Sequence, residues 1–230
     1  YQASSSEMFG STGGGSRPIT EEDAFRPMSP YAAAKLYGHW VTKIYANAYD
    51  LFSCSGLLFN HESPLRGLEF VTRKVSNAVA RISMGLDNEV VLGNLDAKRD
   101  WGYAPEYVEA MWMMLQQDHP ETYVVATGRC HSVRELVETA FGVVDLDWKK
   151  YTRTDKRFLR PLDVGCLVGD PSKIKAELGW SPRTEFAELV EIMVKEDIRR
   201  WEKWLAGERF PWDAFNYPSE VNIITRGLRM

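Results

Sequence analysis

The sequence predicts an α/β fold with a largely parallel β-sheet. Segments with a helical apolar period alternate with short apolar runs of strand-forming residues. Such alternation is typical of parallel sheets, because two parallel strands need a long crossover connection, usually a helix. The chain has 230 residues, of which 44% are hydrophobic and 26% charged. This is enough for one domain, or one and a half, with a sizeable core.

The predicted elements run from residue 31 to residue 205. Ser29 and Pro30 precede the first helix, as expected of a helix start. We expect helices over 31–49, 69–84, 105–117, 132–141, 170–179 and 185–205, and strands over 52–59, 89–92 and 122–127. Gly, Ser and Pro predict a surface loop over 11–30, and 207–230 has no clear period.

Charge and cysteine content argue against several classes of protein. There are 28 Lys and Arg against 32 Asp and Glu, so charge gives no reason to expect a nucleic-acid partner. No apolar run approaches the ~20 residues that a membrane-spanning helix needs, so we expect no membrane partner. The three cysteines lack CxxC spacing, and their odd number makes a disulfide framework or a zinc site unexpected: Cys54, Cys130 and Cys166. A reducing, cytoplasmic location fits these features best.

A tyrosine and a lysine mark the first candidate site. Tyr31 and Lys35 are four residues apart in a predicted helix, so both side chains lie on one face. A nearby ammonium group favours the phenolate and lowers a pKa that starts near ~10, so the tyrosine can serve as a base. The spacing alone is a weak signal, because a surface tyrosine over an aliphatic lysine stem would show it too.

A polar cluster near the start of the chain is the second candidate. Ser4, Ser5, Ser6 and Glu7 follow a presumed strand end, where α/β proteins collect their ligand-binding residues. The hydroxyls could donate a hydrogen bond to a substrate oxygen, and the carboxylate could be a second base. The alternative is a polar loop with a helix cap, because Ser-x-x-Glu is also the capping-box pattern.

Taken together, these residues resemble the extended short-chain dehydrogenase/reductase superfamily, in its nucleotide-sugar branch. More specific stretches resemble the GDP-mannose 4,6-dehydratase family over about residues 1–200: YQASSSEMFG (1–10), SPYAAAKLYGHW (29–40), LLFNHESPLRG (57–67), FVTRK (70–74), LGNLDAKRDWGYAPEYVEAMW (92–112) and the segment 160–182. The tail from about residue 205 has no such counterpart.

The resemblance implies roles for ten residues. The catalytic set is Ser5, Glu7, Tyr31 and Lys35, with Ser5 where the family usually has threonine. Tyr31 and Lys35, together with His61 and Arg66, fall on positions that contact NADP. The positions that line the GDP-sugar site are Asn60, Arg73, Arg99 and Arg160. Arginine suits a diphosphate because its guanidinium binds phosphate bidentately. Structural roles remain open for each, such as a surface ion pair for Arg99 or a turn cap for Asn60.

The resemblance also implies a domain organisation. We expect a partial Rossmann-type parallel sheet with a smaller C-terminal substrate-binding domain. Residues 1–128 would hold the C-terminal part of the NADP-binding domain interleaved with substrate-domain segments, 129–206 mainly the substrate-binding domain, and 207–230 an irregular tail. The chain has no GxxGxxG or GxGxxG after a strand, and the family carries that motif well ahead of the position equivalent to Tyr1. We therefore expect an N-terminally truncated chain that is inactive alone.

The predicted function is that of a GDP-mannose 4,6-dehydratase. Such an enzyme oxidises C4 of the sugar, eliminates water across C5 and C6, and returns the hydride to C6. GDP-mannose is the expected substrate, and a homodimer or homotetramer the expected assembly. Two alternatives remain. An NDP-sugar epimerase or reductase needs the hydroxyl, tyrosine and lysine but has no use for Glu7, and a non-catalytic binding protein could keep a decayed dehydratase scaffold.

Overall fold

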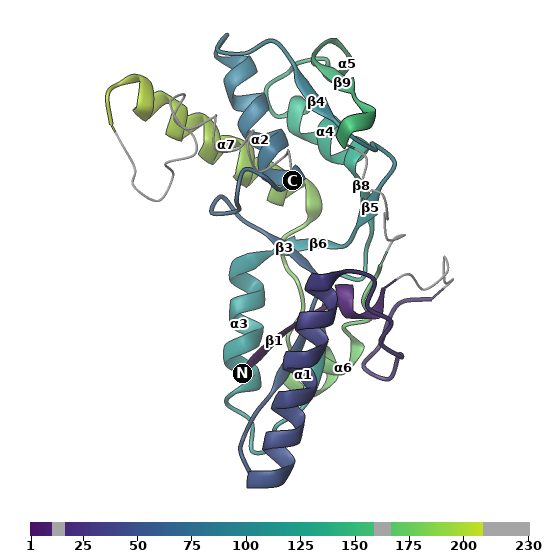
Figure 1. Cartoon of the computed structure of the whole chain (residues 1–230). Coiled ribbons are helices and arrows are strands. Elements are labelled where there is room, and N and C mark those ends of the chain that lie inside the picture. The colour runs from purple at the N-terminus through teal and green to yellow at the C-terminus, as the bar shows by residue number, and fades with distance from the viewer. Residues whose placement is uncertain (11–16, 159–166, 209–230) are drawn as a thin grey trace. The chain divides into compact units, whose positions relative to one another are not determined.

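The computed structural model describes residues 1–10, 17–158 and 167–208 (Figure 1). These residues form two compact units, each described below by itself. Unit 1 comprises 1–62, 96–132 and the described part of 160–186. Unit 2 comprises 63–95, 133–158 and 187–208. The prediction divides the chain between residues 128 and 129. In the structure, the later segment 167–186 also belongs to unit 1, so the two units alternate beyond that division.

Unit 1 is built on a parallel sheet with the strand order β1-β2-β7. These strands are β1 (Gln2–Ser5), β2 (Ser55–Leu58) and β7 (Thr122–Val125). Ser5 lies beside Leu58, and Leu58 beside Val125, so the three carboxyl ends lie level with one another. This confirms the predicted parallel sheet and places the predicted catalytic serine at its carboxyl edge.

Apolar side chains fill both faces of this sheet, as strand alternation requires. On one face Leu58, Tyr123 and Val125 pack against α3 (Ala104–Met114) and α6 (Ser172–Leu178). On the other, Leu57, Phe59, Val124 and Ala126 pack with residues of η1 (Ser6–Phe9) and with Leu36 of α1 (Pro30–Tyr49). Helices thus cover both faces, as expected for a doubly wound sheet.

Helix α1 begins where the sequence predicts. The Ser29 hydroxyl accepts a hydrogen bond from the Ala32 amide at 3.0 Å, and Pro30 occupies the first helical position. The helix ends at Asp50, whose φ of 52° lies in the left-handed region.

Unit 1 also contains two short ladders that the sequence did not predict. Strand β3 (Asn60–Glu62) pairs in parallel with β6 (Trp101–Tyr103). Strand β5 (Lys98–Arg99) pairs in antiparallel fashion with β8 (His131–Ser132). Strands of two or three residues are too short to show a period.

Unit 2 holds most of the remaining elements. They are α2 (Val71–Ser83), β4 (Val90–Leu92), α4 (Val133–Gly142), α5 (Trp148–Tyr151), β9 (Thr152–Thr154), η2 (Lys156–Phe158) and nearly all of α7 (Phe186–Leu205). The predicted strand near residue 90 exists, but it pairs with β9 and lies outside the β1-β2-β7 sheet.

Several other expectations meet the structure only in part. In the part of the chain that the structure describes, no helix is long and apolar enough to cross a membrane. Cys54 is a buried free thiol, whereas Cys130 is disulfide-bonded, a bond that the spacing of the cysteines did not predict. The glycine run 13–15 and the tail from residue 209 lie outside the described residues.

Candidate active site

The carboxyl end of β1 presents a serine and a glutamate. Ser5 is extended, with φ −140° and ψ 142°, and its Oγ accepts a hydrogen bond from the Glu7 amide at 3.2 Å. Ser5 therefore caps η1, which realises the capping alternative with Ser5 in place of Ser4. A serine hydroxyl that accepts one hydrogen bond can still donate its own proton, so this contact leaves the predicted donor role available. The Glu7 side chain is half-buried.

Helix α1 brings the predicted tyrosine and lysine to the same strand. The Lys35 ammonium lies 5.7 Å from the centroid of the Tyr31 ring, as the spacing of four predicts. Its Nζ also donates a hydrogen bond to the Ala3 carbonyl oxygen at 3.0 Å. Lys35 thus joins the helix that carries the tyrosine to the strand that carries Ser5. Tyr31 is 52% exposed, so its ring is open to a ligand.

A buried histidine adds a second link between α1 and β1. The Ser4 Oγ and the His39 Nδ1 lie 2.9 Å apart in a hydrogen bond, and both residues are 2% exposed. Burial, with a smaller effect of the Lys43 charge, lowers the pKa of His39 to about 4, so the imidazole is neutral near pH 7. The sequence reasoning missed His39, although it lies four residues after Lys35 on the same helical face.

Asn60 and His61 follow the carboxyl end of β2. The His61 Nδ1 donates to the Phe59 carbonyl oxygen at 2.8 Å, since a carbonyl can only accept. Its ring stacks on the buried Tyr107 ring at 4.8 Å between centroids. Both predicted residues are half-buried in β3, so the structure places them beside the sheet edge where Ser5 lies.

A buried aspartate, Asp100, is hydrogen-bonded to the loop that follows β7. Asp100 accepts hydrogen bonds from the Thr127 amide at 3.0 Å, the Thr127 hydroxyl at 2.6 Å and the amides of Gly128 and Gly169 at 3.1 and 3.3 Å. Burial raises the pKa of this carboxyl, and the hydrogen bonds oppose that shift. The neighbouring Arg99 is half-buried in β5, and its Nη1 donates to the Lys98 carbonyl at 2.7 Å. Its predicted substrate contact stays a prediction.

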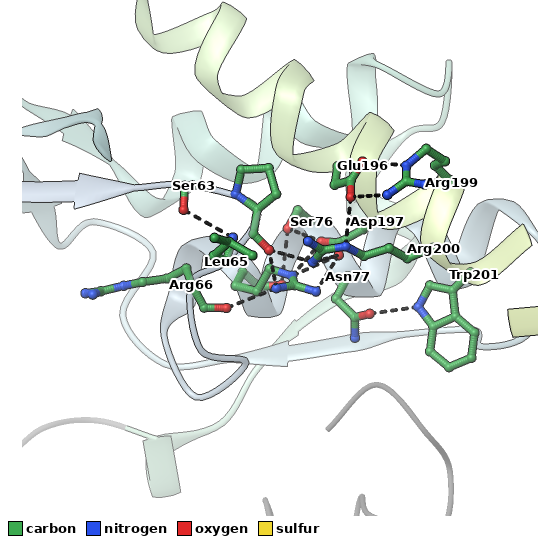
Figure 2. A network of polar contacts seen from close by, with 12 residues as sticks. Ser63, Leu65, Arg66, Ser76, Asn77, Glu196, Asp197, Arg199, Arg200 and Trp201 are labelled. Atoms are coloured by element: carbon green, nitrogen blue, oxygen red, sulfur yellow. Dashed lines mark hydrogen bonds and ion pairs between the residues drawn. The ribbon is translucent and has the colours of Figure 1, made fainter. Parts of the chain in front are cut away.

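Arg73 belongs to a buried network in unit 2. Its Nε and Nη2 both lie 2.8 Å from the Asp197 Oδ1, and Arg73 and Asp197 are 2% and 0% exposed at their side chains. Its Nη1 donates to the carbonyls of Pro64 at 2.6 Å and Arg66 at 3.0 Å. Figure 2 shows Ser76 and Arg200 in the same network, where Ser76 donates to Asp197 at 2.6 Å and Arg200 to the Pro64 carbonyl at 2.5 Å.

These contacts give Arg73 a structural role that the sequence reasoning missed. The guanidinium joins α7 to the 64–66 segment, and its donors on all three nitrogens point at protein acceptors. Its predicted contact with the sugar nucleotide stays a prediction. The Arg66 guanidinium lies 3.6 Å above the Phe70 ring centroid, and no contact tests its predicted role with NADP.

Unit 1 therefore assembles seven of the ten predicted residues: Ser5, Glu7, Tyr31, Lys35, Asn60, His61 and Arg99. Arg66 and Arg73 belong to unit 2, and Arg160 lies outside the described residues. Within the described ranges, no three His, Cys, Asp or Glu side chains gather as a metal site. The groups at the carboxyl edge are a hydroxyl, a phenol, an ammonium and a carboxylate, which suit proton transfer to and from an alcohol or a carbonyl.

Comparisons with known proteins show the family. The family described as GDP-mannose 4,6 dehydratase matches residues 1–193. "GDP-mannose 4,6 dehydratase 1" of Arabidopsis thaliana is 54% identical over 198 residues, which cover 86% of this chain and 54% of that protein. The Dictyostelium discoideum protein named GDP-mannose 4,6 dehydratase is 47% identical over 215 residues, covering 86% of this chain and 60% of its own.

A solved structure supports the fold. RMD from Pseudomonas aeruginosa, complexed with NADPH, superposes with a TM-score of 0.80 at 22% identity, covering 86% of this chain and 66% of its own. At this identity the likeness concerns the fold alone. The chain spans about half the length of the curated relatives it matches, since it covers 54% and 60% of them.

Proposed function

Because this chain belongs to the GDP-mannose 4,6-dehydratase family, we propose that it carries the acid–base residues of an enzyme that converts GDP-mannose to GDP-4-keto-6-deoxymannose. The observation that carries the proposal is the junction of α1 and β1. Lys35 contacts both the Tyr31 ring and the Ala3 carbonyl, so the phenol is held beside the strand that ends at Ser5 and continues to Glu7.

Oxidation of the sugar at C4 uses the Ser5 hydroxyl, the Tyr31 phenol and the Lys35 ammonium. Tyr31 accepts the proton of the sugar C4 hydroxyl as that carbon is oxidised, and Ser5 donates a hydrogen bond to the same oxygen. The Lys35 ammonium lies 5.7 Å from the centroid of the Tyr31 ring, so a positive charge is beside the ring when the proton moves. General-base catalysis of this kind contributes typically about 10²–10⁴-fold to a rate.

Glu7 accounts for the loss of water. Once C4 is a ketone, the neighbouring C5–H bond is acidified, and the Glu7 carboxylate removes that proton. The C5 electron pair forms the C5–C6 double bond as the C6–O bond breaks, and the protonated Glu7 gives its proton to the departing hydroxyl. An epimerase or reductase of the same superfamily has no step for such a carboxylate, so Glu7 favours the dehydratase over that alternative.

The residues present fit a nicotinamide dinucleotide. When bound, such a cofactor would take the hydride from C4 and return it to C6. Lys35, His61 and Arg66 would hold it, and the first two lie in unit 1, whose carboxyl sheet edge is where such folds bind dinucleotides. A lysine and an arginine also suit its anionic phosphates. We propose NADP in preference to NAD, because the resemblance implies it.

The remaining parts of the proposal concern substrate contacts and assembly. Asn60, Arg73, Arg99 and Arg160 remain the proposed contacts of the GDP-sugar, and Arg73 would share its guanidinium with Asp197, which it pairs with at 2.8 Å. A homodimer or homotetramer is proposed on the resemblance alone, and a cytoplasmic location on the number and spacing of the cysteines.

Product analysis of an assembled enzyme tests the function. Here the assembled enzyme is this chain fused behind the segment of the Arabidopsis relative that precedes the matched region. With GDP-mannose and NADP it should yield a product lighter by one water, identified by mass spectrometry and NMR as the 4-keto-6-deoxy sugar. A product of unchanged mass would indicate an epimerase, and tight GDP-mannose binding without turnover a non-catalytic protein. Tyr31→Phe is the inactive control.

A further inference from the structure

We propose that His39 is a positioning residue, which holds the segment Ser4–Phe9 against α1 and so fixes Ser5 and Glu7 relative to Tyr31. The inference rests on the proposed function for what that position means, and on the contacts of unit 1 for the position itself. Neither the family resemblance nor the comparisons gave His39 a role.

The first contact is the hydrogen bond between His39 and Ser4. The two residues are 35 positions apart in sequence, both are buried, and the Oγ–Nδ1 distance is 2.9 Å. Lys35 binds the Ala3 carbonyl one residue earlier on the same strand. Successive residues of β1 are therefore held by two side chains one helical turn apart on α1. Two hydrogen bonds at different positions fix how β1 lies along α1, whereas a single hydrogen bond would let the strand rotate about it.

The second contact reaches the far end of the segment through aromatic rings. The Phe25 ring packs edge-on against His39 at 5.2 Å between centroids, and it packs against the Phe9 ring, tilted by 39°, at 5.0 Å. Phe9 is 1% exposed and ends η1. The Arg26 amide, next to Phe25, donates to the Met8 carbonyl at 2.8 Å. His39 thus supports the segment at Ser4 directly and at Phe9 through Phe25, and Ser5 and Glu7 lie between these supports.

A neutral imidazole suits this place because it combines a flat ring with one donor and one acceptor. Phenylalanine would keep the ring contact with Phe25 and lose the hydrogen bond. Asparagine would keep a polar atom near the position of Nδ1 and lose the ring. These two replacements therefore separate the polar contact from the packing contact.

Positioning matters for rate because a misplacement of about 1 Å in a reacting group can lower it about 10²-fold. In the assembled enzyme we expect His39→Phe and Ser4→Ala to lower kcat about 10- to 100-fold with little change in the KM for GDP-mannose. His39→Asn should recover kcat only in part, because it keeps a polar atom for Ser4 but loses the ring contact with Phe25. Ile174→Ala is the matched control, because it removes core volume on the opposite face of the sheet and destabilises without touching β1's link to α1.

Amide hydrogen exchange in this chain gives a readout that needs no activity. The Glu7 amide donates to Ser5 and the Arg26 amide to Met8, so both report whether the segment is held. We expect His39→Phe to speed exchange at these amides at least about 10-fold, and more than Ile174→Ala does at equal overall stability.

The outcomes are distinct. Unchanged exchange at Glu7, or faster exchange without a loss of kcat, overturns the positioning role. A loss of kcat in His39→Phe that Ser4→Ala does not share also overturns it, because both substitutions remove the hydrogen bond between Ser4 and His39. If the wild-type assembled enzyme makes no dehydrated product, the proposed function fails, and the exchange data still decide whether His39 anchors the segment.

Discussion

Acid should destabilise this protein through the buried imidazole of His39. Burial lowers the pKa of His39 from 6.5 to about 4, because a charged ring would lose its hydration beside Phe25 and Ser4. In the unfolded chain the same ring titrates near ~6.5. Between these two pKa values the unfolded state binds more protons than the folded state. The stabilising term is thus fully present above about pH 6.5 and is lost as the pH falls towards 4.

The difference between the two pKa values sets the magnitude. A shift of one pKa unit corresponds to about 1.4 kcal/mol, so His39 contributes up to about 3 kcal/mol of stability at pH 7 that is absent near pH 4. That is a large part of the total, since a domain is stable by about 5–15 kcal/mol. His39→Phe cannot titrate, so its stability should fall less between pH 7 and pH 4.5 than that of the wild type.

Urea unfolding followed by circular dichroism measures this difference. Free energies of unfolding of the wild type and His39→Phe would be compared at several values between pH 7 and pH 4.5, so that carboxylates common to both cancel. His119→Gln is the control, because it removes an exposed histidine and leaves the contacts of His39 in place. Parallel pH profiles for the wild type and His39→Phe would refute the reasoning, since they would mean that His39 is charged or hydrated in the folded protein.

Three further substitutions test the site and the network. In the assembled enzyme Glu7→Gln keeps the size of the side chain but loses proton transfer, so absorbance of reduced nicotinamide should build up with little product, and normal product formation would assign the elimination to another residue. Tyr31→Phe should lower turnover about 10²–10⁴-fold, and near-normal turnover would exclude Tyr31 as the base. Arg73→Met removes the guanidinium that pairs with the Asp197 carboxylate and should destabilise this chain by about 3–5 kcal/mol at pH 8. Burial already raises the pKa of Asp197 to about 6, and losing Arg73 raises it further, so the deficit should shrink as the pH falls to 5 and the carboxyl takes up a proton. A deficit below about 1 kcal/mol in urea unfolding would show that the pair is not desolvated.

Long elements were predictable because their signals are local. Ser29 and Pro30 mark the start of α1 in the sequence, and the capping hydrogen bond to Ala32 confirms the reason. The apolar run at β2 predicted a buried strand, and all four residues of β2 are buried. Strand β4 was also predicted, but its partner β9 lies some sixty residues later and has no apolar run of its own. Local residue propensity can predict that a strand forms, whereas the strand with which it pairs depends on the rest of the chain.

In the candidate site, too, the contacts within one helix could be predicted from the sequence and the contacts between elements could not. The approach of Lys35 to Tyr31 follows from helical spacing, so the sequence could predict it. The contacts of Lys35 with Ala3 and of His39 with Ser4 depend on how α1 packs on β1, and no sequence spacing encodes that packing. His39 could have been suspected only as a polar residue one turn after Lys35.

Arg73 shows that residue type alone does not predict which anion an arginine contacts. An arginine predicts an anionic partner, and the sequence reasoning took that partner to be a diphosphate. The structure supplies Asp197 instead, 124 residues away on α7, together with two carbonyls of the 64–66 segment. The degree of burial indicates whether an arginine pairs with a carboxylate of the protein or remains accessible to an anionic ligand. At 2% exposure the guanidinium has exchanged water for protein acceptors, while Arg99 in β5 remains half-exposed and can still meet a ligand. Burial is therefore the first property to check before an arginine is assigned to a nucleotide site.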